Sequence, residues 1–184
     1  GVVHFTNNIF KIVLIGRNVD RSVLFRFGFP AFIASFSGAW LLLRLTYLPD
    51  IFTYTMGSDT YFITPVKLTI AILLLVFALW EVIPSLQKIR FGKEHFFLGG
   101  LLSGFFGGLS GMQGAIRSAF LIKSGISKEA YIATGTAVAC VVDISRLSVY
   151  ATRFTAANLH ENMGLLIFAI LCAVAGALLG KRLL

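Results

Sequence analysis

The feature that most constrains this chain is the recurrence of apolar runs about as long as a bilayer is thick. A membrane-spanning helix needs about 20 consecutive, mostly apolar residues. Four such runs are present, at residues 23–45, 66–86, 128–151 and 163–180, and the connection 46–65 is expected to be a loop. Hydrophobic residues make up 57% of the 184 residues and charged residues 13%, where a soluble domain carries about a quarter. The sequence therefore predicts an all-α polytopic transmembrane helical bundle.

The net charge of +8 does not indicate a nucleic-acid-binding protein. The basic residues stand at the ends of the apolar runs, as the positive-inside rule predicts, and do not form one patch. Two cysteines, Cys140 and Cys172, lie inside apolar runs, and the three histidines are scattered along the chain. No spacing typical of a metal site is found, so we expect no metal, no cofactor and no nucleic-acid partner.

A glycine-rich segment, residues 95–124, poses a topological question. If it crossed the membrane once, the basic residues after it would lie on the side opposite those before it. If it enters and leaves on one side, most basic residues share that side, in agreement with the positive-inside rule. Two arms of about 12 residues, at about 1.5 Å per residue, would reach about mid-bilayer. We therefore predict a re-entrant helical hairpin over 95–124, broken by the glycines of 107–111.

The tip of this hairpin is the candidate binding site. Irregular backbone at membrane depth is tolerated where it lines a cavity, and free amides at the start of the second arm favour an anion. The candidate substrate-binding residues here are Ser110, Gly111, Met112, Gln113, Gly114 and Arg117. Structural alternatives remain open for them: the glycines can serve tight helix packing, Gln113 can satisfy carbonyls of the tip, and Arg117 can extend to the headgroups.

A second group of charges lies in the run 128–151. Asp143 and Arg146 are three residues apart on the expected helix, so they can pair. Because charges in the middle of a span usually face a cavity or each other, Arg146 is a further candidate for binding the anion, and Asp143 for orienting Arg146 or carrying a coupling proton. The alternative is an ion pair that only joins helices. Glu81 is expected to be an interfacial charge rather than a proton site.

These residues carry a resemblance to a known family. The stretch "GGLLSGFFGGLSGMQGAIRSAFLIKSGISKEAYIATGTAVA" resembles the second repeat of the sulfite exporter TauE/SafE family, whose repeats each begin with a glycine-rich segment. The stretches "HFTNNIFKIVLIGRNVD" and "GFPAFIASFSGAWLL" resemble the close of that family's first repeat. Gln113 and Ala115 replace two glycines of the motif, and Arg117 and Phe120 also depart from it, which leaves the exact substrate open.

The resemblance implies half of an inverted-repeat transporter. Residues 1–86 would form the end of the first repeat and the following transmembrane helices, and residues 87–184 the second repeat. It also implies a multi-pass permease of a bacterial inner membrane, for sulfite, a sulfonate or a related organic anion, with proton coupling as an option. The implied partners are the small anion, the lipid bilayer and N-terminal helices of the same protein that this chain lacks, and a homodimer is left open.

Two other functions are open at this level. Residues 108–111, Gly-Leu-Ser-Gly, match the nucleophile pattern of rhomboid intramembrane serine proteases, in which Ser110 would need a nearby base. His160 is the only later histidine, and it stands in a polar loop. A structural or channel-like membrane subunit is the other alternative. We expect a transporter and not an enzyme.

Overall fold

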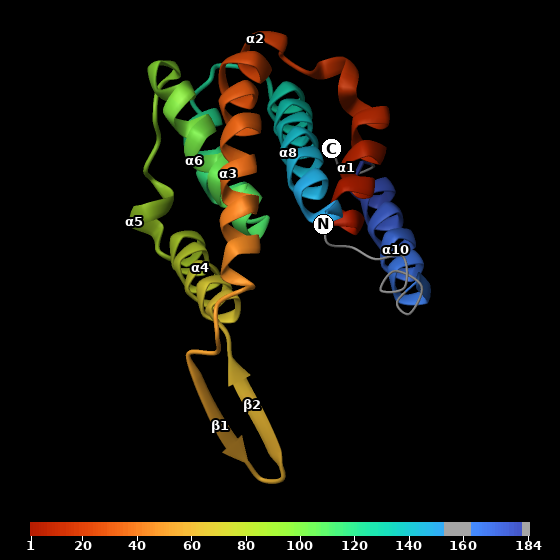
Figure 1. Cartoon of the computed structure of the whole chain (residues 1–184). Helices are drawn as coiled ribbons and strands as arrows, with labels where there is room; N and C mark the ends of the chain where they lie inside the picture. The colour runs from red at the N-terminus through yellow and green to blue at the C-terminus, as the bar shows by residue number, and fades with distance from the viewer. Residues whose placement is uncertain (153–162, 182–184) are drawn as a thin grey trace.

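The computed structural model describes residues 1–152 and 163–181, which form helices and one β-hairpin. The elements in chain order are α1 (Val2–Ile15), a 3₁₀ turn (Gly16–Asn18), α2 (Arg21–Val23), a π turn (Leu24–Gly28), α3 (Phe29–Leu45), β1 (Phe52–Met56), β2 (Asp59–Ile63), α4 (Pro65–Val82), α5 (Pro84–Gln87), a 3₁₀ turn (Lys93–His95), α6 (Phe96–Ser110), α7 (Gly114–Leu121), α8 (Lys128–Ala151) and α10 (Met163–Lys181). Figure 1 shows α3, α6 and α8 at the centre, with α1 and α10 on one flank and α4 and α5 on the other.

Four of the described helices are long and apolar enough to cross a membrane. They are Arg21–Leu45, which joins α2, the π turn and α3, then α4, α8, and Met163–Gly180 of α10. The predicted polytopic helical bundle is therefore confirmed. The second run was predicted too long, because α4 ends at Val82. Ile83 precedes Pro84 and takes extended backbone, φ −80° and ψ 113°, which a proline imposes on the residue before it.

The connection between α3 and α4 was expected to be a loop, but it contains an antiparallel β-hairpin. β1 and β2 pair with Tyr54 opposite Tyr61, and the two rings stack with centroids 5.4 Å apart. Gly57, at φ +69°, lies in the turn between the strands. Figure 1 shows the hairpin projecting from the bundle beyond the ends of α3 and α4. The alternation of threonine with aromatic residues around a Gly-Ser turn is typical of such a hairpin.

Three glycines of α6 bring its backbone into contact with α3. A Cβ on Gly100, Gly104 or Gly108 would overlap the carbonyl oxygens of Phe27, Ala31 and Ser35, respectively. The three glycines and the three residues that they meet are each spaced by four residues, and both series run in the same direction. The two helices therefore pack in parallel along one small-residue face. Such close packing is common between membrane helices, because lipid offers no hydrophobic drive for association and contact itself has to hold helices together.

α6 and α7 form a helical hairpin whose outer ends lie together. Phe91, just before α6, donates its N–H to the carbonyl of Ala119 in α7 over 3.0 Å, and its ring stacks on that of Phe120 with centroids 4.3 Å apart. A Cβ on Gly99, in the first turn of α6, would overlap the same Phe120 ring. The segment therefore turns back on itself, as the charge distribution predicted.

The break in this hairpin comes later than predicted. α6 continues through Gly107 and Gly108 to Ser110, and α7 begins at Gly114. The prediction of a break at 107–111 was wrong because Gly108 belongs to the packing face against α3, so the tight-packing alternative holds for it. The irregular backbone is confined to residues 111–113.

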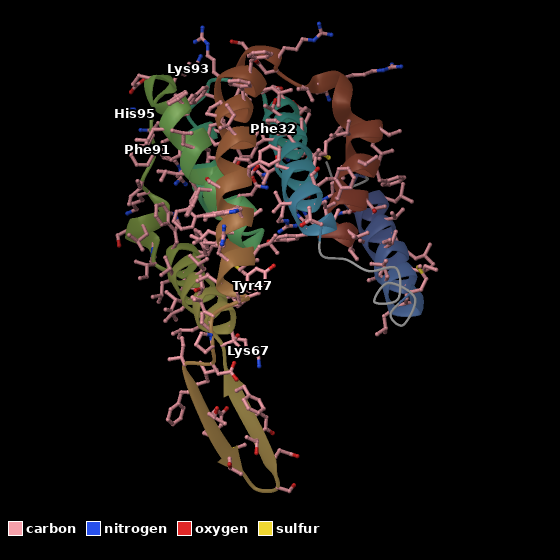
Figure 2. The ribbon with its side chains drawn as sticks, viewed as in Figure 1. Phe32, Tyr47, Lys67, Phe91, Lys93 and His95 are labelled. Atoms are coloured by element: carbon pink, nitrogen blue, oxygen red, sulfur yellow. The ribbon has the colours of Figure 1, made fainter. Side chains whose placement is uncertain are left out.

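The connection that contains Lys93 and His95 lies at the end of the bundle where α6 begins. Figure 2 shows Phe91, Lys93 and His95 there, and it shows Tyr47 and Lys67 toward the other end of the helices, next to the β-hairpin. Lys93 lies beside Gly125 in the connection from α7 to α8, with its Nζ 3.6 Å from where a Cβ would stand. His160, which also entered the sequence predictions, lies outside the described residues.

Candidate functional site

The break between α6 and α7 is built on Gly111. Its φ of +82° is left-handed, and its N–H donates to the carbonyl of Gly107 over 2.8 Å, which closes the end of α6. A Cβ at this position would overlap Nη1 of Arg146, which reaches the break from α8. Glycine is therefore required here for two independent reasons, the backbone conformation and the approach of the guanidinium.

Ser110 completes the end of α6 by local hydrogen bonds. Its hydroxyl donates to the carbonyl of Phe106 over 3.0 Å and accepts the N–H of Met112 over 3.2 Å. These partners are backbone groups of its own turn, and among the described residues no histidine is hydrogen-bonded to this hydroxyl. The described contacts of Ser110 are those of a serine that caps the end of its own helix.

The start of α7 leaves backbone donors without helical partners. Gln113 is the N-cap, and the first backbone bond within the helix is from Arg117 N to Gln113 O, at 2.9 Å. The N–H groups of Gly114, Ala115 and Ile116 precede it, so helix geometry gives them no intrahelical acceptor. No heavy atom lies within 4 Å of where a Cβ on Gly114 would stand. The first turn of α7 therefore opens onto free space.

That space is a pocket of about 260 Å³ between the break and α4. One wall is the irregular backbone and the start of α7, residues 111–115. The other wall is a single face of α4, formed by Leu74, Phe77, Ala78 and Glu81. Glu81, which was expected to be an interfacial charge, is exposed in the last turn of α4 and also lines this pocket. The spacing of these four residues marks one helix face, but only tertiary packing turns that face toward the break.

Gln113 lies in the same wall and is 3% exposed. Its Oε1 lies 3.5 Å from the hydroxyl of Ser103, and its Nε2 is buried with no hydrogen-bond partner among the described residues. The side chain packs along Gly107, with Cδ 3.2 Å from where a Cβ would stand. A buried amide donor without an acceptor is costly, so this group favours an acceptor that comes from outside the described part of the chain.

Asp143 and Arg146 pair as the sequence predicted. Asp143 is 1% exposed and Arg146 is 6% exposed, and Arg146 Nη2 donates to Asp143 Oδ1 over 2.9 Å. The other carboxylate oxygen contacts α1, at 2.6 Å from His4 Nδ1 and 3.2 Å from Asn8 Nδ2. Because an ionised carboxylate only accepts hydrogen bonds, His4 carries a proton on Nδ1 in this arrangement. The ion pair therefore also ties α8 to α1.

His4 and Asn8 were not among the sequence candidates. They lie four residues apart on α1, so they present one polar face within an apolar helix. That pattern could have indicated a buried polar partner. The partner itself could not have been identified from the sequence, because 139 residues separate His4 from Asp143.

Arg146 and Tyr150 of α8 both contact the C-terminal end of α6. The Tyr150 hydroxyl donates to the carbonyl of Gly108 over 3.2 Å, and Arg146 lies one turn earlier on α8, against Gly111. A helix C-terminus carries a partial negative charge, which a cation stabilises. Nε of Arg146 is buried and has no partner among the described residues.

Arg117 of α7 contacts α8 at a point far from Arg146 along that helix. Its Nε packs 3.3 Å from where a Cβ of Gly135 would stand, and its Nη1 is buried without a partner among the described residues. Gly135 precedes Arg146 by 11 residues, which is about 16 Å of helix. The guanidinium is turned toward α8, so this conformation is not the extension to the headgroups that was the alternative.

The predicted site residues thus separate into three groups. Gly111, Met112, Gln113 and Gly114 line one pocket, and Ser110 caps the helix beside it. Arg146 contacts Gly111 from the side of α8, with Asp143 behind it. Arg117 stands apart on the face of α7 that meets α8. In the described part of the chain, no group of three or more histidine, cysteine or acidic side chains is placed to hold a metal ion.

Comparison with known proteins identifies the family. The family model of the sulfite exporter TauE/SafE matches residues 2–184. Comparisons with curated proteins and with solved structures gave no match. The family match extends over nearly the whole chain, and four described helices have the length and composition of membrane spans. The chain therefore belongs to the sulfite exporter TauE/SafE family of membrane transporters and is a multi-pass membrane protein.

Proposed function

We propose that this permease carries a small sulfur-containing or organic anion across a bacterial inner membrane, and that the anion binds in the pocket at the break between α6 and α7. The observation that carries this proposal is the open first turn of α7, whose first N–H groups have no intrahelical acceptor and whose residues Gly114 and Ala115 line a pocket of about 260 Å³. Unpaired N–H groups and the positive end of the helix dipole together favour an anion.

The charges around the break support this polarity. The C-terminus of α6, which is the negative end of a helix dipole, meets the break as well, and it would repel an anion. Arg146 lies against Gly111 at that end, so its cation offsets the negative dipole and adds positive charge beside the pocket. Arg117 does not take part in this proposal, because its guanidinium packs against Gly135 of α8 and does not line the pocket. In this proposal, Asp143 orients Arg146 toward the break.

The lining of the pocket favours an anion with an organic part. The pocket holds about 260 Å³, and Leu74, Phe77 and Ala78 give it an apolar wall on α4. A short-chain sulfonate would place its sulfonate oxygens at the amides and its carbon atoms against that wall.

Further helices and a second copy are proposed partners. None of the residues in the apolar window of α10 is buried within the chain, and α4 exposes large apolar side chains such as Leu75 and Leu79. These surfaces suit contact with lipid, with the helices of a first repeat, or with another subunit. Rocking of one repeat against the other around the break would then give alternating access, as in other inverted-repeat transporters.

The test uses two glycines with the same surroundings. Gly114 and Gly164 both stand in the first turn of a helix, and at neither would a Cβ meet a heavy atom within 4 Å. Gly114→Val fills part of the pocket, whereas Gly164→Val changes a site elsewhere. In proteoliposomes of the full-length protein, uptake of sulfite, sulfonates, sulfate and carboxylates is compared. We expect Gly114→Val to lower uptake of the preferred anion at least tenfold and Gly164→Val to leave it unchanged; equal uptake by both variants would refute the site.

A further inference from the structure

A second pocket, of about 330 Å³, lies between α1, α8 and α10. α1 packs against both α8 and α10, and the pocket occupies the angle that these two helices leave between them. None of the residues that line it also lines the pocket at the break between α6 and α7. We propose that the second pocket is a binding site for an anionic phospholipid, whose headgroup is held by Lys11. This inference goes beyond the proposed transport function and does not depend on it.

Lys11 gives the pocket its charge. It is half-buried on α1, and among the described residues it makes no ion pair or hydrogen bond. Glu129, which stands on the same face of α8 as two residues of the pocket, is exposed, is hydrogen-bonded to Ser127 and does not line the pocket. The Thr136 hydroxyl, which lines the pocket, donates to the carbonyl of Ile132 over 2.8 Å, so its oxygen is left to accept a hydrogen bond. A ligand that suits this lining carries a negative charge and a hydrogen-bond donor.

The depth of the pocket matches the level of lipid headgroups. The connection after α1 is fixed to the second turn of α8, because Asp20 N–H donates to Thr134 Oγ1 over 2.9 Å. Lys11 lies four residues before the end of α1, about 6 Å of helix, and Thr136 lies eight residues into α8, about 12 Å. Basic pockets between membrane helices bind acidic headgroups, and a lysine at this level can lay its stem along apolar surface and its ammonium among phosphates.

α10 supplies the apolar side of the site. Gly176 and Gly180 line the pocket, and a Cβ on either would meet no heavy atom within 4 Å, whereas Gly100, Gly104 and Gly108 of α6 are closed off by the backbone of α3. None of the residues in the apolar window of α10 is buried within the chain, so acyl chains can run along this helix. A helix packed here would leave the Lys11 cation without a counterion. A phospholipid supplies the phosphate and the apolar chains together.

The position of α1 gives such a lipid a consequence for stability. Among the described elements, α10 packs chiefly against α1, which also carries His4 and Asn8 to the carboxylate of Asp143 in α8. A lipid that contacts all three helices would hold α10 on α1 and α1 on α8. Because a ligand that binds the folded state raises the melting temperature, the lipid should stabilise the protein.

The experiment follows thermal unfolding of the full-length protein in detergent, titrated with phosphatidylglycerol, phosphatidylcholine or glycerol 3-phosphate. Lys11→Gln removes the cation, and Lys128→Gln makes the same change at an exposed position at the start of α8, outside the pocket. We expect Lys11→Gln to lower the apparent affinity for phosphatidylglycerol at least about tenfold, because a charge-assisted hydrogen bond is lost. Lys128→Gln and Lys11→Arg should bind it as wild type does. Phosphatidylcholine and glycerol 3-phosphate should not raise Tm at the same concentrations.

A second pair of variants tests the place of the lipid. Gly176→Leu fills the pocket and should abolish stabilisation by phosphatidylglycerol, whereas Gly164→Leu, at an open position elsewhere on α10, should keep it. The site is overturned if phosphatidylglycerol stabilises Gly176→Leu as it does wild type, or if Lys11→Gln and Lys128→Gln respond equally. A response to glycerol 3-phosphate that equals the response to the lipid and depends on Lys11 would assign the pocket to a soluble anion instead. Dissociation of an oligomer by Lys11→Gln in light scattering, with lipid binding unchanged, would make the pocket a subunit interface and overturn the lipid assignment.

Discussion

The buried pair of Asp143 and Arg146 gives the sharpest test of the structure. Asp143→Asn removes the carboxylate charge and preserves the size of the side chain. Arg146 would keep its cation at 6% exposure without a carboxylate partner. Removing one partner of a buried ion pair costs about 3 to 5 kcal/mol in the free energy of unfolding, because the remaining charge stays desolvated.

The expected shift in thermal stability follows from the length of the chain. For 184 residues, 1 kcal/mol corresponds to about 2 to 4 °C in Tm, so Asp143→Asn should lower Tm by about 6 to 20 °C. Replacing both partners, with Asp143→Asn and Arg146→Met together, removes both charges. This double variant should therefore lose less than the sum of the two single variants.

The assay is thermal unfolding in detergent, followed by circular dichroism. Asp59→Asn on the exposed β-hairpin is the control carboxylate, and it should stay within about 0.5 kcal/mol of wild type. The reasoning is refuted if Asp143→Asn melts within about 2 °C of wild type. It is refuted equally if the double variant loses the full sum of the single losses, because the two charges would then not be coupled.

Two further predictions concern α6. Gly104→Ala should lower the free energy of unfolding by about 1 to 3 kcal/mol, because its Cβ would overlap the backbone of Ala31 and force α3 and α6 apart. The control Gly176→Ala has open space around it and should not destabilise the protein. Equal melting temperatures of the two variants in detergent would contradict the packing of α3 against α6. Ser110→Ala should lower the free energy of unfolding by about 1 kcal/mol, because the hydrogen bond to Met112 N is lost, and it should leave anion uptake within about threefold of wild type. Loss of a proteolytic activity with this variant would instead support the protease hypothesis.

The glycine-rich segment shows how far local sequence leads. Charge asymmetry across the connections was enough to predict that residues 95–124 turn back. It could not separate the glycines that pack from the one that breaks the helix. Gly100, Gly104 and Gly108 serve α3, about 70 residues earlier in the chain, and only Gly111 takes a positive φ. Composition alone does not reveal which glycine faces a neighbouring backbone, since that depends on the partner helix.

The sequence prediction missed the β-hairpin for a different reason. Its alternating threonine and aromatic residues around Gly57 were present in the sequence, but aromatic residues between two spans also suit an interfacial loop. Here two local patterns competed, and the pairing of β1 with β2 decided between them. The end of α4 was also open to prediction, because Pro84 restricts the residue before it.

The sequence by itself determined the membrane-spanning character of the chain, the turning back of its glycine-rich segment and the pairing of Asp143 with Arg146, because each depends on length, charge or spacing within one segment. The tertiary structure alone decided that His4 completes the ion pair, that Arg146 meets Gly111, and that Glu81 faces the start of α7. These contacts join side chains on different helices. Helix packing sets which faces meet, and that packing depends on the whole set of apolar and small-residue surfaces at once.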